Sequence, residues 1–163
     1  MKKIILSSVV LAAIFFSCKK DSTPTPTPTP TPVTFNATSV LGSWKITSDS
    51  AWLSNGTASQ TFDVLHDTSF YATCQIDDIY TFNTGGTYVY TDAGVSCGNG
   101  NGSGTWSASG NTMTIDTYSA TVTDFSSTKM RMVSPNGSFD DTDAVTGVIT
   151  QYTYNFRTTY TKQ

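Results

Sequence analysis

The stretch Leu41-Gly42-Ser43-Trp44-Lys45-Ile46-Thr47 sets the pattern on which the folding part of the chain is built. Two apolar side chains, Trp44 and Ile46, alternate here with polar neighbours. Alternation with a period of two residues is typical of a strand that buries one face and exposes the other. The stretch therefore predicts that the folded domain begins with a half-buried strand, and that Trp44 points inward and plugs one end of the fold.

The same alternation recurs to the end of the chain. Apolar and aromatic side chains share one face of a predicted strand at Tyr80 and Phe82, Tyr88 and Tyr90, Met113 and Ile115, Met130 and Met132, and Val148, Tyr152, Tyr154 and Phe156. Turn-forming residues separate these runs at 83–86, 109–111 and 135–137. A single helical turn is predicted over 37–41, with Asn36 as its N-cap.

Consecutive short hairpins without long crossovers predict an all-β fold. An antiparallel up-and-down β-barrel of about eight strands would remove the exposed sheet edges by closing the sheet. A β-sandwich of two sheets is the alternative. Residues 35–163 have the length of one domain with a single core.

The charge of this domain excludes some partners. From residue 36 onward it carries five lysines and arginines against eleven aspartates and no glutamate, a formal charge of −6. We expect no nucleic-acid partner, because proteins that bind nucleic acid are basic. We expect a monomer.

The N-terminus predicts export. Residues 1–17 have a positive start, Met1-Lys2-Lys3, and an apolar run from Ile4 to Phe16 that is too short to span a membrane, which indicates a signal peptide. The pair Ser17-Cys18 resembles the lipobox of bacterial lipoproteins. That resemblance implies cleavage before Cys18 and its modification with fatty-acyl chains such as palmitate, which would anchor the protein to a membrane. A plain signal peptide with an incidental cysteine is the alternative.

Residues 18–34 form the anchor and a linker. Five Thr-Pro repeats from Thr23 to Pro32 favour an extended polyproline II segment of roughly 31 Å. Lys19 follows the cysteine, and by resemblance to lipoprotein sorting in Gram-negative bacteria this favours the outer membrane. The sequence leaves the cell surface and the periplasmic face open.

The three cysteines divide into an anchor and a pair. Modification of Cys18 leaves Cys74 and Cys97, an even number, as expected of a disulfide in an exported protein. A turn near 84–85 brings the two cysteines to similar levels on neighbouring arms.

An ordered series of motifs resembles a known family. Gly42-x-Trp44 after a short helical turn resembles the start of lipocalins. The wider series resembles the lipocalin-like domain of bacterial surface lipoproteins and consists of Cys74, 78–83, 86–88, Cys97 and 104–107. The resemblance covers most of residues 39–157, and it implies a barrel more than an activity.

Sequence motifs for catalysis or metal binding are weak. His66 has no second histidine to complete a zinc site, and no sharp turn from a strand into a helix is expected to present a nucleophilic serine. The acidic run 140–143 lacks EF-hand spacing and is interpreted as a solvated loop. The glycine-rich stretch 97–104 is interpreted as a connection at the barrel mouth, with a ligand lid as a further hypothesis. We therefore expect no enzymatic activity, no cofactor and no metal.

The inward aromatic residues leave two functions open. They could line a cavity for a small hydrophobic or amphipathic ligand, or they could fill the barrel and leave an interaction module without a cavity. The candidate ligand-binding residues are Tyr80, Phe82, Tyr88, Tyr90, Trp106, Tyr152 and Tyr154, with Phe156 on the same face as the last two. Trp52 is expected in turn-like sequence, exposed and free for another role.

Overall fold

The computed structural model describes residues 34–98 and 100–163, which belong to one compact unit. The predicted signal peptide, the lipidation site Cys18 and the Thr-Pro repeats lie outside the described residues. Within the described part of the chain, no helix has the length and apolar character needed to cross a membrane.

The domain begins with α1 (Ala37–Val40), the predicted helical turn. The Asn36 side chain accepts hydrogen bonds of 2.9 Å from the backbone N–H groups of Thr38 and Ser39, which otherwise would have no partner at the start of a helix. The capped turn predicted from the sequence is therefore confirmed, with Leu41 as its C-cap rather than its last residue.

The described residues form ten strands, all antiparallel and all in one sheet. They are β1 (Gly42–Ser54), β2 (Ser59–Asp63), β3 (Ile79–Phe82), β4 (Thr87–Thr91), β5 (Gly102–Ser109), β6 (Thr112–Ile115), β7 (Tyr118–Phe125), β8 (Lys129–Val133), β9 (Gly137–Thr142) and β10 (Ile149–Lys162). A 3₁₀ turn, η1 (Thr73–Gln75), lies between β2 and β3.

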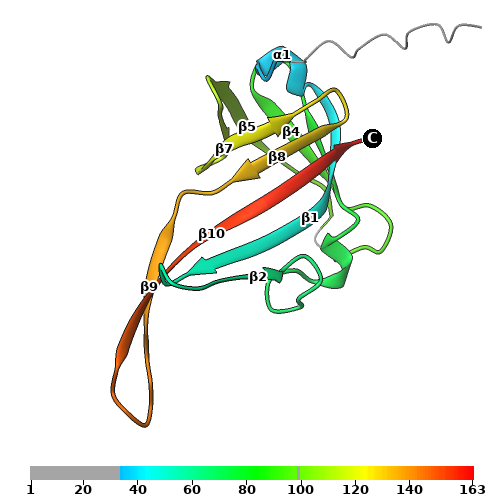
Figure 1. Ribbon diagram of the computed structural model, residues 1–163. Coiled ribbons are helices and arrows are strands. Elements are labelled where there is room, and N and C mark those ends of the chain that lie inside the picture. The colour runs from blue at the N-terminus through cyan, green and yellow to red at the C-terminus, as the bar shows by residue number, and fades with distance from the viewer. Residues whose placement is uncertain (1–33, 99) are drawn as a thin grey trace, which may run out of the picture. The chain divides into compact units, whose positions relative to one another are not determined.

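Eight of these strands close into a ring. The order of the strands in the sheet is β2-β1-β3-β4-β5-β6-β7-β8-β10-β9. In addition, β1 pairs with β10, from the partners Trp44 and Lys162 at one end to the partners Ser54 and Thr153 at the other. This pairing closes the ring and leaves β2 and β9 outside it (Figure 1). The predicted antiparallel barrel of about eight strands is confirmed, and the β-sandwich, which needs two separate sheets, does not describe this arrangement.

The two extra strands lengthen one side of the ring. β9 pairs with the first half of β10, and together they form a hairpin that projects from the ring (Figure 1). β2 pairs with the last five residues of β1. The turn-like assignment around Trp52 is wrong, because β1 continues to Ser54 with partners on both sides. Trp52 lies opposite Thr61 on one side and Asn155 on the other.

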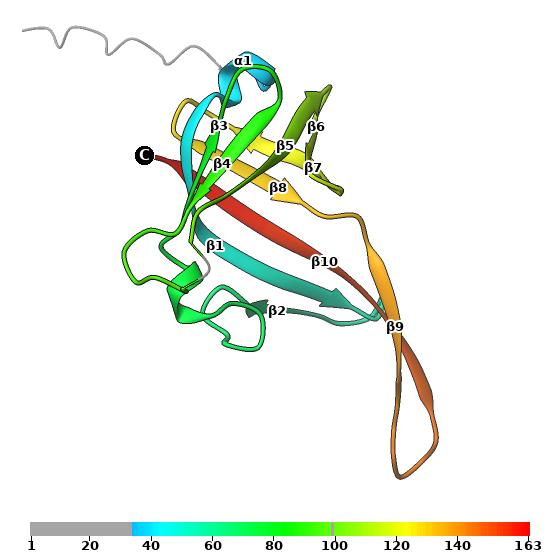
Figure 2. The same ribbon diagram turned by 180° about the vertical axis from the view of Figure 1, so that it is seen from behind.

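One half of the ring is filled by the hydrophobic core. Its largest completely buried side chains are Trp44, Phe82, Met113, Met130 and Met132. α1 lies at this end of the ring, and the segment between β2 and β3 lies toward the other end (Figure 2). Trp44, the predicted plug, donates a hydrogen bond of 2.6 Å from its indole Nε1 to the carbonyl oxygen of Val40 in α1.

A β-bulge in β1 changes which residues face inward. The register with β10 shifts between Ile46 and Ser48, so that one extra residue is inserted. Before the bulge the buried positions are Trp44 and Ile46, and after it they are Asp49 and Ala51. Because strand residues alternate between faces, a single inserted residue exchanges the two faces. The bulge thereby places a carboxylate inside the ring.

Candidate functional site

A cavity of about 400 Å³ lies inside the ring, beyond the filled half. Inward-facing side chains of β1, β3, β7 and β10 form its walls, and the segment between β2 and β3 supplies the rest. The lining residues are Ile46, Asp49, Val64, Phe70, Tyr71, Tyr80, Tyr118, Phe156, Thr158 and Tyr160. Phe70 is 55% exposed, so the cavity wall reaches solvent there. The volume lies in the usual range of small-molecule sites.

Asp49 is the acidic residue that lines this cavity, and it is 5% exposed. Its Oδ2 accepts a 2.6 Å hydrogen bond from the hydroxyl of Tyr71, and its Oδ1 accepts a 3.1 Å hydrogen bond from the hydroxyl of Thr158. Two neutral donors therefore hold the carboxylate in place.

The tyrosines around Asp49 remain protonated well beyond neutral pH. Burial, and then the hydrogen bond to Asp49, raises the pKa of Tyr71 above its ordinary value. Burial also raises the pKa of Tyr80, Tyr118 and Tyr160, and the negative charge of Asp49 adds to the effect at Tyr118 and Tyr160. These hydroxyls consequently act as hydrogen-bond donors or acceptors, and the cavity has no anionic tyrosinate at physiological pH.

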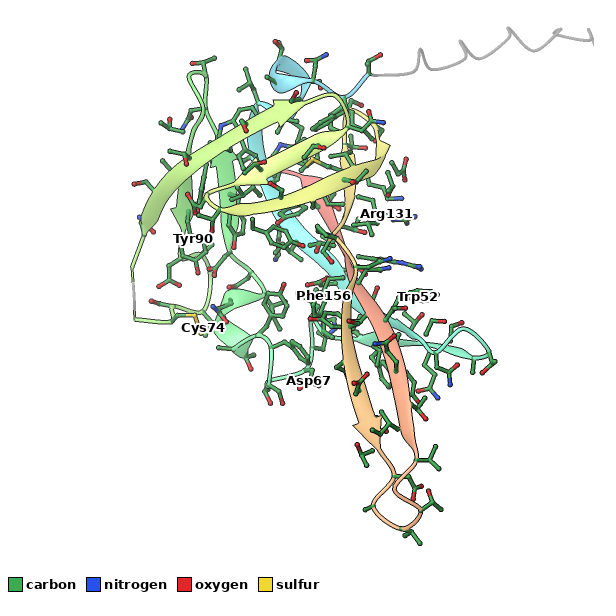
Figure 3. The ribbon with its side chains drawn as sticks, turned by 90° about the vertical axis from the view of Figure 1, so that its left-hand side faces the viewer. Trp52, Asp67, Cys74, Tyr90, Arg131 and Phe156 are labelled. Carbon is green, nitrogen blue, oxygen red and sulfur yellow. A yellow bond between two sulfur atoms is a disulfide. The ribbon has the colours of Figure 1, made fainter. Side chains whose placement is uncertain are left out.

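Residues 64–78 cover one side of the cavity and are fixed at two places. The backbone carbonyl of Asp49 accepts hydrogen bonds from the N–H groups of Val64 and Leu65, at 3.0 and 3.3 Å. At the other place, Cys74 and Cys97 lie at disulfide distance, with 2.12 Å between their Sγ atoms. Figure 3 shows this sulfur pair at Cys74, below Tyr90. The segment that supplies Phe70 and Tyr71 is thus tied to β1 and to the β4–β5 connection.

Of the seven candidate ligand-binding residues, Tyr80 lines the ring cavity. Phe82 and Trp106 instead belong to the filled core, where their ring centroids are 5.4 Å apart. The Tyr88 hydroxyl donates to Asp116 at 2.7 Å, and the Tyr90 hydroxyl donates to the buried Asp78. These two tyrosines satisfy their hydroxyls with carboxylates outside the cavity lining.

Tyr152 and Tyr154 lie on the part of β10 that pairs with β9. The ring of Tyr152 stacks on Phe139 at 5.5 Å, and Tyr154 is 6.2 Å from the same ring. The alternation of Tyr152, Tyr154 and Phe156 on β10 was predicted correctly, but Val148 lies before the strand, and this end of the strand extends past the ring. Phe156, further along, does line the cavity, and its ring centroid is 6.1 Å from that of Phe70.

The cavity-lining residues that were not predicted from the sequence include Asp49, Phe70, Tyr71, Thr158 and Tyr160. Asp49 follows a bulge that the alternation of Trp44 and Ile46 does not reveal. Phe70 and Tyr71 belong to a segment without strand periodicity. Extending the β10 alternation by four residues beyond Phe156 would have found Thr158 and Tyr160, since both lie on the same face.

The weaker candidates are separate from the cavity. His66 is exposed, and its Nδ1 lies 2.8 Å from Oδ2 of Asp63. Residues 140–142 belong to β9, and the Asp143 carboxylate accepts hydrogen bonds from the N–H groups of Val145 and Thr146. In residues 34–98 and 100–163, no group of three or more histidine, cysteine or acidic side chains is placed to hold a metal ion.

A second hollow of about 370 Å³ lies between α1, the turn 84–86 and β5. Its lining residues come from α1 and its C-cap, from the turn between β3 and β4, and from β5. They are Ala37, Thr38, Leu41, Thr84, Gly85, Gly86, Trp106, Ser107 and Ala108. It holds no charged side chain, so the ring cavity is the better candidate for specific recognition.

A comparison with protein families supports the architecture. A family model described as a lipocalin-like domain matches residues 40–134, more than half of the chain. The matched residues include β1 to β8, and therefore seven of the eight ring strands. Comparisons with curated proteins and with solved structures gave no match. The family is consistent with the binding of a small hydrophobic ligand. Together, the closed ring and the family match show that the chain belongs to the lipocalin-like domain family.

Proposed function

We propose that this protein binds a small hydrophobic or amphipathic molecule in the ring cavity, and that it does so while anchored by lipid to the outer membrane. The observation that carries the binding part is the cavity of about 400 Å³, whose walls include six aromatic rings. Binding pockets for small molecules combine such apolar walls with a few placed polar groups. The proposal assigns binding, and not catalysis, to this site.

The division of the ring into two halves supports this function. Buried methionine, tryptophan and phenylalanine side chains fill the half near α1 and make it a close-packed support. The other half holds tyrosines whose hydroxyls need partners when they are buried. The alternative, an interaction module with a filled ring, fits the first half and leaves the second half without a role.

A test of ligand binding is native mass spectrometry of the full-length chain purified from the cell envelope. A co-purifying molecule that is lost on unfolding is the expected result. The matched variants are Thr158→Trp, which would fill the cavity, and Thr114→Trp, on the outer side of β6 and away from it. If neither the native chain nor the Thr114 variant carries a ligand, the filled-ring alternative gains support. If the Thr158 variant retains the ligand, the site is elsewhere.

The anchor is a proposal from the sequence alone. The apolar run that ends at Ser17-Cys18 and the odd number of cysteines support it. Cys18→Ser is expected to move the protein from the membrane fraction to the soluble fraction, or to leave it unprocessed. Unchanged partitioning into detergent would contradict the anchor. Protease treatment of intact cells would then distinguish the cell surface from the periplasmic face.

A further inference from the structure

The charge of Asp49 has no cationic partner in the described protein. The ion pairs within residues 34–98 and 100–163 join His66 to Asp63 and Lys129 to Asp124, and neither involves Asp49. The residues that line the cavity include no lysine, arginine or histidine. A buried carboxylate is ordinarily paired with a cation, because the loss of hydration disfavours its charge. The hydroxyls of Tyr71 and Thr158 replace only part of that hydration.

Aromatic rings surround this carboxylate. The cavity walls hold Phe70, Tyr71, Tyr80, Tyr118, Phe156 and Tyr160. The faces of aromatic rings attract organic cations, and cages of such rings recognise quaternary and methylated ammonium groups. An aromatic cage with a carboxylate inside it attracts a cation both through the faces of its rings and through the negative charge of the carboxylate. Neither of these attractions acts on an anion.

The net charge of the domain also favours a cationic ligand. The domain has eleven aspartates against five basic side chains, so the potential around it attracts cations. An anionic ligand such as a fatty acid would meet repulsion from the domain and from Asp49.

From these contacts we propose that the ring cavity binds a small amphipathic amine or quaternary ammonium compound, with its cationic nitrogen at Asp49 and its apolar part between the aromatic walls. This inference rests on the proposed ligand-binding function and adds the charge of the ligand. Asp49 is a binding residue in it, and Tyr71 and Thr158 orient the carboxylate.

The first experiment needs only the native chain. Benzyltrimethylammonium and neopentylbenzene have nearly the same shape and differ by one positive charge. Calorimetric or NMR titration of the purified full-length chain is expected to show at least about tenfold tighter binding of the cation. Equal affinities, or tighter binding of the neutral compound, would overturn the charge assignment and leave the binding function intact. Absence of binding of both compounds would overturn both proposals.

The second experiment locates the charge. Asp49→Asn keeps the size and shape of the side chain, replaces one carboxylate oxygen with an NH2 group and removes the charge. Asp140→Asn on exposed β9 removes a charge far from the cavity. The cation is expected to lose about tenfold or more in affinity with the first variant and less than about twofold with the second. The affinity for neopentylbenzene should be unchanged in both. An equal loss in the two variants would overturn the role of Asp49, and circular dichroism checks that each variant is folded.

Discussion

The strand β1 carries two tryptophans that should differ sharply in their effect on stability. Trp44 is completely buried in the filled half of the ring, and its indole Nε1 donates to the Val40 carbonyl at 2.6 Å. Trp52 lies beyond the bulge on the other face and is only partly buried, with the Arg157 guanidinium 5.2 Å from its ring centroid. We predict that Trp44→Ala is the much more harmful replacement.

The magnitudes follow from these contacts. Truncation of a buried tryptophan to alanine costs about 3–5 kcal/mol, and the loss of the indole donor leaves the Val40 carbonyl without that partner, which adds about 1–3 kcal/mol. For Trp52 the loss is a cation–π contact of about 0.5–1 kcal/mol and part of an apolar surface, about 1–2 kcal/mol together. Since domains are stable by about 5–15 kcal/mol, Trp44→Ala removes a large share of the total.

Urea unfolding followed by fluorescence is a suitable measurement, because Trp106 remains as a buried probe in both variants. Trp44→Phe is the matched control. It keeps an aromatic ring in the core and removes the hydrogen bond, so we expect an intermediate loss. Equal destabilisation by Trp44→Ala and Trp52→Ala would refute the assignment of the two faces of β1.

Three other properties of the domain can be tested by separate measurements. Cys74→Ala should lower stability by about 2–4 kcal/mol, and peptide mapping without reductant should find Cys74 joined to Cys97; two free thiols in protein from the cell envelope would contradict the pairing. Reduction should also weaken binding of the neutral dye N-phenyl-1-naphthylamine, because Cys74 ties down the segment that covers the cavity; unchanged affinity would show that this segment is held by its hydrogen bonds alone. Burial and the hydrogen bond to Asp116 raise the pKa of Tyr88 to about 12, so its contribution to stability is fully present below pH 10 and is lost as the pH rises through 12. An NMR titration of the Tyr88 ring carbon that gives an ordinary value near 10 would contradict that contact.

The order of the strands in the ring could be predicted from the sequence, because the hairpins of a meander depend on features that are local. Alternation in β3, β4, β8 and β10 shows which faces are buried, and the turn residues at 83–86 and 109–111 show where hairpins reverse. Hydrophobic pattern and turn chemistry set the register of antiparallel strands, so these signals are sufficient for a meander, and the need to remove its exposed edges predicts that it closes. The strand pairs β3–β4 and β5–β6 are formed across those two turns.

The contents of the ring could not be predicted in the same way. Alternation places Tyr80, Phe82 and Trp106 inside, but it does not show how far along the axis each one lies. In the structure, Phe82 and Trp106 fill the closed half while Tyr80 borders the cavity. Position along the axis depends on strand tilt and stagger, which are properties of the whole ring and not of one segment.

The bulge in β1 explains the omission of Asp49. Without an extra residue, β1 would keep one face inward along its whole length, and even-numbered positions would continue inward from Trp44 and Ile46. Asp49 would then point to solvent, as an aspartate beside Ser48 and Ser50 ordinarily does. The inserted residue reverses the faces after Ile46 and turns Asp49 toward Tyr71 and Thr158. Bulges commonly redirect a side chain next to a functional site, and here the bulge before Ser48 turns the carboxylate of Asp49 into the ring cavity.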